Sequence, residues 1–224
     1  MTGVLPPGIR TYKPRRSRIT ARAERAITEQ ARYLIPTHDG PLDLSSEWGL
    51  GVPVVMEIGF GDGRATAQMA AADPATGILA VDVHTPGVGN LLWRIDEGGL
   101  ANVRVMEADA LRVLDQMIPP SSLAGLRTYF PDPWPKARHH KRRLIQPSVL
   151  DLAAGRLVDG GFWHLATDWS EYATAIVGCF AEDSRWAGGV TPRPANRPET
   201  RYERRAIAEG RPVTDLLYRL RQPV

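Results

Sequence analysis

Short apolar runs alternate with helix-forming segments through most of this chain, and this alternation restricts the fold more than any other feature of the sequence. Five runs are typical of buried strands, being short, mostly apolar and bounded by turn residues: 53–58, 77–83, 102–109, 125–130 and 160–168. A helical pattern follows each of them: 64–72, 91–100, 110–118, 147–158 and 170–183. Strands that are joined by helices usually lie parallel. The sequence therefore predicts an α/β fold, with a mostly parallel sheet and helices on both of its faces.

The first part of the chain differs from the rest. Residues 10–18 are rich in proline, lysine and arginine, and the helical pattern that follows at 19–35 has one apolar face. The remaining length, in a chain of 224 residues with 43% hydrophobic content, suits one substantial core. We expect a basic N-terminal arm and helix at 1–35 and a single domain at 36–224.

Several classes of protein and site are not expected. No window holds the roughly 20 apolar residues of a membrane span, and the N-terminus lacks the apolar core of a signal peptide, so we expect a cytoplasmic protein outside membranes. The single cysteine, Cys179, lies in an apolar run, and we expect a buried helix residue rather than a nucleophile. Because no cysteines and histidines have the spacing of zinc ligands, we expect no metal.

Positive charge is concentrated in two segments. Residues 1–34 hold eight Lys or Arg and two acidic residues, and residues 134–143 hold five Lys or Arg and no acidic residue. The rest of the chain holds 15 Lys or Arg and 23 acidic residues. This separation favours binding to a polyanion, because each phosphate that a basic side chain neutralises releases counterions. A nucleic acid is the expected partner, although a solvated basic tail would also explain the first segment.

The first three predicted strands end in a glycine-rich turn and three carboxylates. Residues 57–63 read EIGFGDG, and glycine permits both a sharp turn and a close approach of backbone to a ligand. Asp82 ends the second strand, where it could accept ribose hydroxyls, and Asp109 follows the third, where it could meet an adenine amino group. Glu57 would repel a pyrophosphate, whereas the sulfonium and amino group of S-adenosylmethionine are cationic. The pattern favours that methyl donor over a dinucleotide.

A proline-rich acidic turn joined to a basic run follows the fourth predicted strand. Residues 129–144 read YFPDPWPKARHHKRRL. Proline fixes its own φ angle and restricts the residue before it, so the three prolines hold Asp132 and Trp134 in a preset turn. We expect Asp132 to project over the methyl group of the donor, and the basic side chains of 136–143 to contact phosphates. A stiff loop that only caps the sheet is the alternative.

These residues resemble the bacterial tRNA (guanine-N7-)-methyltransferases, a family of class I S-adenosylmethionine-dependent enzymes. The matching segments occur in the family's order between residues 55 and about 206: EIGFGDG, VDVHTPGVGNLL, ADA, FPDPWPKARHHKRRLIQP, ATDW and TRYERR. The resemblance implies a Rossmann-like class I methyltransferase fold with a seven-stranded sheet. It also implies methyl transfer from S-adenosylmethionine to N7 of guanine at position 46, in the variable loop of tRNA, by a monomer or a homodimer.

The resemblance also implies a role for each matching residue. The donor site would be lined by Glu57, Gly59, Gly61, Gly63, Asp82, Asp109 and Asp132. Asp132 would also face the guanine as the catalytic residue, and the nucleoside would be held by Lys136, Asp168, Thr200, Arg201, Tyr202 and Glu203. The RNA would be contacted by Arg138, His139, His140, Lys141, Arg142 and Arg143. The chain departs from the family at Asp82, where Glu is common, and at Arg201 and Tyr202, which replace Lys and Phe.

The implied reaction needs placement more than proton transfer. N7 of guanine carries an in-plane lone pair and no proton, so it can attack the methyl group directly. Positive charge then moves onto the purine, which makes its N1–H and amino group stronger hydrogen-bond donors. A carboxylate that accepts from them, Asp132 or Asp168, would bind the transition state more tightly than the substrate.

Two other classes of function share part of this pattern. A nicotinamide-dependent oxidoreductase would have the sheet and the glycine turn, but it would leave the basic run and Glu57 unexplained. A non-catalytic RNA-binding protein would keep the basic segments without needing the carboxylates. Basic segments do not identify the RNA, so a guanine in ribosomal RNA or in a cap stays open. His84 could shape the donor loop or bond only to backbone.

Overall fold

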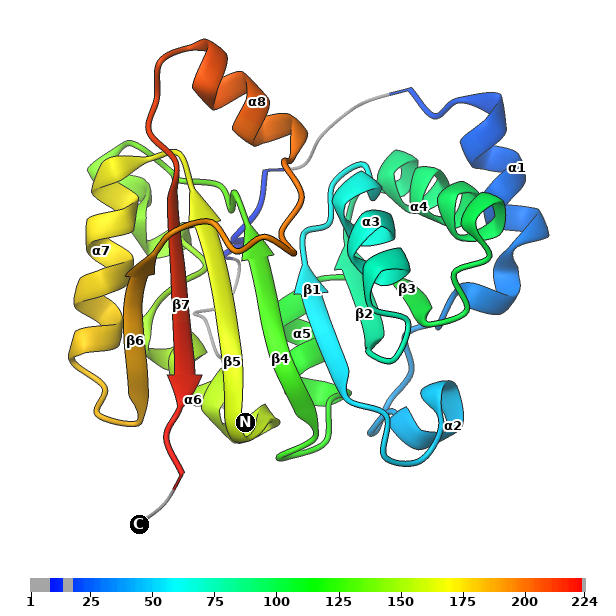
Figure 1. The fold of residues 1–224 in the computed structure, drawn as a ribbon, viewed down its shortest axis with the longest axis horizontal. Helices are drawn as coiled ribbons and strands as arrows, with labels where there is room; N and C mark the ends of the chain where they lie inside the picture. The colour runs from blue at the N-terminus through cyan, green and yellow to red at the C-terminus, as the bar shows by residue number, and fades with distance from the viewer. Residues whose placement is uncertain (1–8, 14–17, 223–224) are drawn as a thin grey trace.

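The protein is built on one seven-stranded sheet, in a computed structural model that describes residues 9–13 and 18–222 (Figure 1). The strands are β1 (Val54–Ile58), β2 (Gly77–Asp82), β3 (Val103–Glu107), β4 (Leu123–Tyr129), β5 (Leu157–Thr167), β6 (Trp186–Thr191) and β7 (Thr214–Leu220). Their order is β3-β2-β1-β4-β5-β7-β6. β1 to β5 pair in parallel, whereas β7 runs antiparallel to both β5 and β6. The predicted mostly parallel α/β sheet is confirmed.

Helices cover both faces of the sheet (Figure 1). They are α1 (Ala21–Glu29), α2 (Leu44–Trp48), α3 (Arg64–Ala72), α4 (Thr85–Gly98), α5 (Ala110–Gln116), α6 (Pro147–Arg156), α7 (Ser170–Ala181) and α8 (Arg201–Ala208), with the 3₁₀-helices η1 (Ala31–Tyr33) and η2 (Ala137–Arg142). Successive strand residues point to opposite faces, so each strand contributes to two cores. Ile78 and Ala80 pack with α1, α3 and α4, whereas Leu79 and Val81 pack with α5, α6 and α7.

The N-terminal helix α1 lies along α4 (Figure 1). Ala23 and Ala26 of α1 are buried. The two helices approach closely because Gly89 has no side chain: a Cβ atom there would lie 2.4 Å from the carbonyl oxygen of Ala23. This close packing makes α1 part of the core on its side of the sheet.

Some elements differ from prediction for local reasons. The helix predicted at 91–100 begins at Thr85, because Gly87 and Gly89 are buried helix positions rather than loop residues. The helix predicted at 19–35 ends at Glu29, where the backbone leaves helical geometry and η1 follows. The strand predicted at 160–168 begins directly after α6. The turn-rich segment before β1 contains the short helix α2.

The remaining expectations concern membranes, metals and the cysteine. Within the described ranges, no helix combines the length and the apolar character that crossing a membrane requires. Nor do three or more His, Cys, Asp or Glu side chains of these ranges group closely enough to hold a metal ion. Cys179 lies on α7, half-buried rather than fully buried, and burial raises the pKa of its thiol to about 11. Its pKa and position agree with a packing role.

Candidate active site

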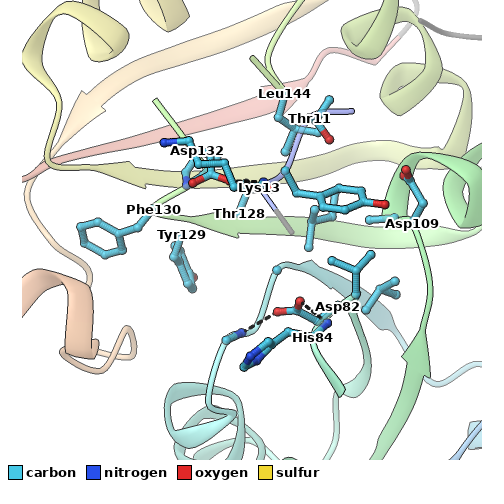
Figure 2. A pocket seen from close by; sticks show the side chains of 18 of the residues that line it. Thr11, Lys13, Asp82, His84, Asp109, Thr128, Tyr129, Phe130, Asp132 and Leu144 are labelled. Atoms are coloured by element: carbon cyan, nitrogen blue, oxygen red, sulfur yellow. Dashed lines mark hydrogen bonds between the residues drawn. The ribbon is translucent and has the colours of Figure 1, made fainter. Parts of the chain in front are cut away.

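A cavity of about 380 Å³ opens beyond the carboxyl ends of β1, β2 and β4. Ligands bind at this edge in open α/β sheets. Figure 2 shows the carboxylates of Asp82, Asp109 and Asp132 around the cavity, although they are far apart in the sequence. The fold therefore brings three of the predicted donor-site acids around one cavity.

The turn after β1 presents bare backbone to this cavity. Gly59, Gly61 and Gly63 have φ angles of 77°, 66° and 71°, a region that glycine adopts far more readily than other residues. Asp82 braces the turn, because its carboxylate accepts the N–H of Gly61 at 2.8 Å and that of His84 at 3.0 Å. Burial raises the pKa of Asp82, and these N–H donors offset part of that rise.

Glu57 is buried behind the turn and does not line the cavity. Its residue surface is 3% exposed, and no described residue donates a hydrogen bond to its Oε2 atom. Burial raises the pKa of Glu57 to about 7, while the charge of Arg127 acts in the opposite direction. A buried polar atom without a partner is costly, which indicates a place for a cation or a hydrogen-bond donor.

Asp109 and His84 combine a structural bond with a place in the cavity wall. Asp109 accepts the N–H of Leu111 at 3.0 Å and thereby caps α5, and the residue also lines the cavity. His84 precedes α4, and its backbone N–H holds Asp82. The predicted role of His84 in shaping the donor loop is therefore at least partly a backbone role.

The turn after β4 is sharply bent around Asp132. Phe130 and Trp134 have positive φ angles of 55° and 46°, which residues other than glycine rarely adopt. Asp132 Oδ2 accepts the backbone N–H of Lys13 at 2.7 Å, and Trp134 donates its indole N–H to the carbonyl of Thr11 at 3.2 Å. Strained backbone of this kind clusters at functional sites. The preset turn predicted from the prolines is present.

The N-terminal segment before α1 covers part of the cavity. Residues 10–13 contribute to its wall, and Figure 2 shows Thr11 and Lys13 on the Asp132 side. The charge of this arm predicted binding to a polyanion, and the sequence did not predict its contact with Asp132. The arm contributes backbone groups to this contact, the N–H of Lys13 and the carbonyl of Thr11, and a pattern of side chains cannot predict such a contact. The predicted arm residues 1–8 and 14–17 lie outside the described residues.

α8 brings only part of its predicted set to the cavity. Thr200 caps the helix by accepting the N–H of Glu203 at 3.1 Å. Tyr202 lines the cavity, with its ring 6.2 Å from that of Phe130 and nearly parallel to it. Arg201 is exposed. Glu203 is 4% exposed and buried in ion pairs, which contradicts the expectation that it contacts the nucleoside directly.

Asp168 and Lys136 do not line the cavity. Asp168 follows β5 and forms an ion pair with Arg211 at 2.7 Å, so its carboxylate already has a cationic partner. Lys136 is exposed immediately before η2. Neither residue is among those that line the cavity with Asp132.

Part of the basic run forms a surface beside the Asp132 turn. Arg138 and Lys141 are exposed. The guanidinium of Arg142 lies 5.0 Å from the centre of the Trp134 ring, and the ring of His139 meets the same indole edge-on. These contacts with the Trp134 ring order the side chains of Arg142 and His139 in this surface.

The end of the basic run belongs to the protein interior. Arg143 is 4% exposed. It bonds to the carboxylate of Glu171 and donates to the carbonyl of Pro133 at 3.0 Å. His140 is half-buried and lies 4.0 Å from the same Glu171 carboxylate. Arg143 therefore supports the turn that holds Asp132, and its burial contradicts the predicted RNA contact.

Comparisons with known proteins agree with these features. The chain matches a family model described as "Putative methyltransferase" over residues 52–216. It is 52% identical over 221 residues to the tRNA (guanine-N(7)-)-methyltransferase of Streptomyces avermitilis, an alignment that covers 96% of this chain and 76% of that protein. It is 45% identical over 224 residues to the protein of the same name from Halorhodospira halophila, covering 96% of each.

Solved structures show the fold. The 16S rRNA methyltransferase KamB has a TM-score of 0.57 at 17% identity, covering 80% of this chain and 91% of that one. A variant 16S rRNA (adenine(1408)-N(1))-methyltransferase from Catenulisporales acidiphilia, with S-adenosylmethionine as cosubstrate, has a TM-score of 0.55 at 14% identity, covering 90% and 92%. The predicted class I methyltransferase fold is confirmed. The sequence comparisons go further, and the chain belongs to the tRNA (guanine-N(7)-)-methyltransferase family.

Proposed function

We propose that this protein transfers the methyl group of S-adenosylmethionine to N7 of a guanine in tRNA. The observation that carries the proposal is that Asp132 lines the same cavity as Asp82 and Asp109, in a chain of this family. Position 46 in the variable loop is a finer part of the proposal and rests on the resemblance. We also propose that the protein acts in the cytoplasm, where its substrate would be found.

The residues of the cavity fit the methyl donor. Gly59 and Gly61 offer backbone without side chains to its amino-acid portion, and Asp82 and Asp109 would accept from its ribose and its adenine. Glu57 places an unpaired, buried oxygen behind the same turn, where negative charge favours a cationic ligand. Bound there, the donor supplies an electrophilic methyl group on a positively charged sulfur.

The protein would act on the reaction by placement. N7 of guanine attacks the methyl carbon, the N–C bond forms while the C–S bond breaks, and the products are S-adenosylhomocysteine and a cationic purine. Asp132 would accept from the guanine N1–H or amino group, which donate more strongly as charge reaches the ring. The bond from the Lys13 N–H to Asp132 supports this role, because it shows that an N–H donor can reach the carboxylate.

The surface beside the Asp132 turn would hold the RNA backbone. We propose phosphate contacts for the exposed Lys136, Arg138 and Lys141 and for Arg142, with His139 and His140 at the border of this surface. Asp168 would contact the nucleoside only after its ion pair with Arg211 opens. Arg201, exposed in the first turn of α8, would add a contact from the other side of the cavity.

The test is methyl transfer from labelled donor to unmodified tRNA, followed by nucleoside analysis. The wild type should form N7-methylguanosine, and Asp132→Ala should lower kcat by at least about 100-fold, the cost of removing one charge-stabilising group. Asp159→Ala removes an exposed carboxylate on β5 and should leave turnover unchanged. Donor binding without transfer to tRNA would point to another RNA substrate, and absence of donor binding would overturn the proposal.

A further inference from the structure

A buried ion-pair network joins α8 to the sheet. Its centre is Arg197, which precedes α8 and is 2% exposed. The guanidinium binds both oxygens of Glu203, at 2.7 and 3.0 Å, and both oxygens of Asp215 on β7, at 2.6 and 2.8 Å. A fifth N–H bond reaches the carbonyl of Pro198 at 3.4 Å. All five N–H donors of Arg197 are thereby used.

The network reaches the cavity at both ends. Asp215 is 2.9 Å from the Nε2 atom of His164, and the Nδ1 atom of His164 is 3.0 Å from the Tyr129 hydroxyl. Tyr129 lines the cavity from β4. At the other end, Glu203 lies in the first turn of α8 beside Tyr202, which lines the cavity from above β1 and β4. One chain of bonds thus connects two cavity walls.

Stability alone does not account for this arrangement. Apolar residues of similar volume often stabilise a core as well as a buried ion pair does. Burial alone would raise the pKa of Asp215, but the hydrogen bonds from His164 and Arg197 hold it below its ordinary value. The Asp215 carboxylate therefore stays charged, and the planar guanidinium fixes the carboxylates of Asp215 and Glu203 in direction as well as in distance.

We propose that Arg197 is a positioning residue for methyl transfer, an inference that rests on the proposed function. By holding Glu203 against Asp215, it fixes the first turn of α8 and places Tyr202 in the cavity wall. Glu203 then acts through Arg197, and Thr200 adds the cap that begins the helix. This role explains why Glu203, the sequence neighbour of the cavity residue Tyr202, is buried in ion pairs.

The test compares Arg197→Ala with Arg193→Ala. Arg193 belongs to the same loop and donates to the same Glu203 carboxylate at 3.1 Å, but its side chain is 45% exposed. In Arg197→Ala, hydrogen exchange of the α8 amides should accelerate by at least about tenfold, and kcat/KM for tRNA should fall by about 100-fold. Added guanidinium ion should restore part of both losses. Arg193→Ala should resemble the wild type in both.

The two measurements separate this inference from the proposed function. If the wild type did not methylate tRNA, the proposed function would fail while the exchange rates could still be compared. Unchanged exchange in Arg197→Ala, or a loss of turnover in a folded protein that guanidinium does not restore, would overturn the positioning role. If Arg197→Ala does not fold, Arg197→Lys replaces it. Lysine keeps the positive charge but lacks the planar guanidinium that binds two carboxylates through paired N–H groups. Turnover and exchange at wild-type levels in Arg197→Lys would equally overturn it.

Discussion

Glu57 is the residue whose ionisation should matter most near neutral pH. Its pKa is raised to about 7 by burial, so much of it is protonated at that pH without a ligand. Negative charge on Glu57, behind the glycine turn, would favour a cationic donor in the cavity. We predict that affinity for S-adenosylmethionine falls below about pH 7, by up to about tenfold per pH unit, when measured by calorimetry. Glu57→Gln should bind weakly and without this dependence, and a wild-type affinity that does not vary with pH would contradict the prediction.

The Glu57 carboxyl should also make the stability of the fold depend on pH. Stability should fall as the pH rises, whereas the affinity for the donor should increase. Its pKa is higher in the folded protein, about 7, than the ordinary value of 4.5, so the folded state favours the protonated form. The resulting stabilisation is complete below pH 4.5 and is lost as the pH rises through about 7. We predict that Glu57→Gln is more stable than the wild type at alkaline pH, by up to about 3 kcal/mol in denaturant unfolding. Equal stabilities there would show that Glu57 has a partner when folded.

The positions of site residues were predictable where strand ends fix them. Asp82, Asp109 and Asp132 follow strand ends, and parallel strands bring those ends together. Arg143 and Glu203 were predicted wrongly, because their partners come from distant segments and only the folded chain shows them buried.

At the level of elements, the contact of α1 with α4 depends on one missing side chain. A Cβ at Gly89 would overlap the Ala23 carbonyl, so we predict that Gly89→Ala lowers the free energy of unfolding by about 1–3 kcal/mol. Gly155→Ala is the control, since this α6 glycine has no atom within 4 Å of a built Cβ. It should raise stability by about 0.5–1 kcal/mol, because alanine favours helix. Equal effects in denaturant unfolding would contradict this account.

Elements were predictable where an apolar face marks them. The first five strands and the helices between them carry that face, and their existence followed from the sequence. β6 contains two adjacent glycines, Gly188 and Gly189, and lies at an edge, so it has little apolar pattern. α8 is rich in charged residues, and it is held by Glu203 and by Ala206 rather than by an apolar stripe. An ion pair that replaces apolar contacts leaves no periodic signal.

For the whole molecule, the separation of charge should appear in the salt dependence of tRNA binding. Each lost phosphate contact lowers the slope of log K against log salt by about 1. We predict this change for Arg142→Ala, measured by filter binding over a range of salt. Arg185→Ala is the control, because Arg185 precedes β6 at the opposite end of the sheet and pairs with Asp151 and Asp183. A similar change of slope in both variants would show that the surface beside Asp132 is not the RNA site.

The position of β7 has a consequence for how the protein is made. β7 is inserted between β5 and β6, and it is the strand that β6 pairs with. During synthesis on the ribosome, β6 emerges first and keeps an open edge until α8 and β7 have followed. Asp215 arrives on β7 as well, so Arg197 is buried with its full set of partners only then. A nascent chain that stops before β7 is thus left with an exposed edge on β5 and with β6 unpaired, and chaperones and proteases can recognise such an edge.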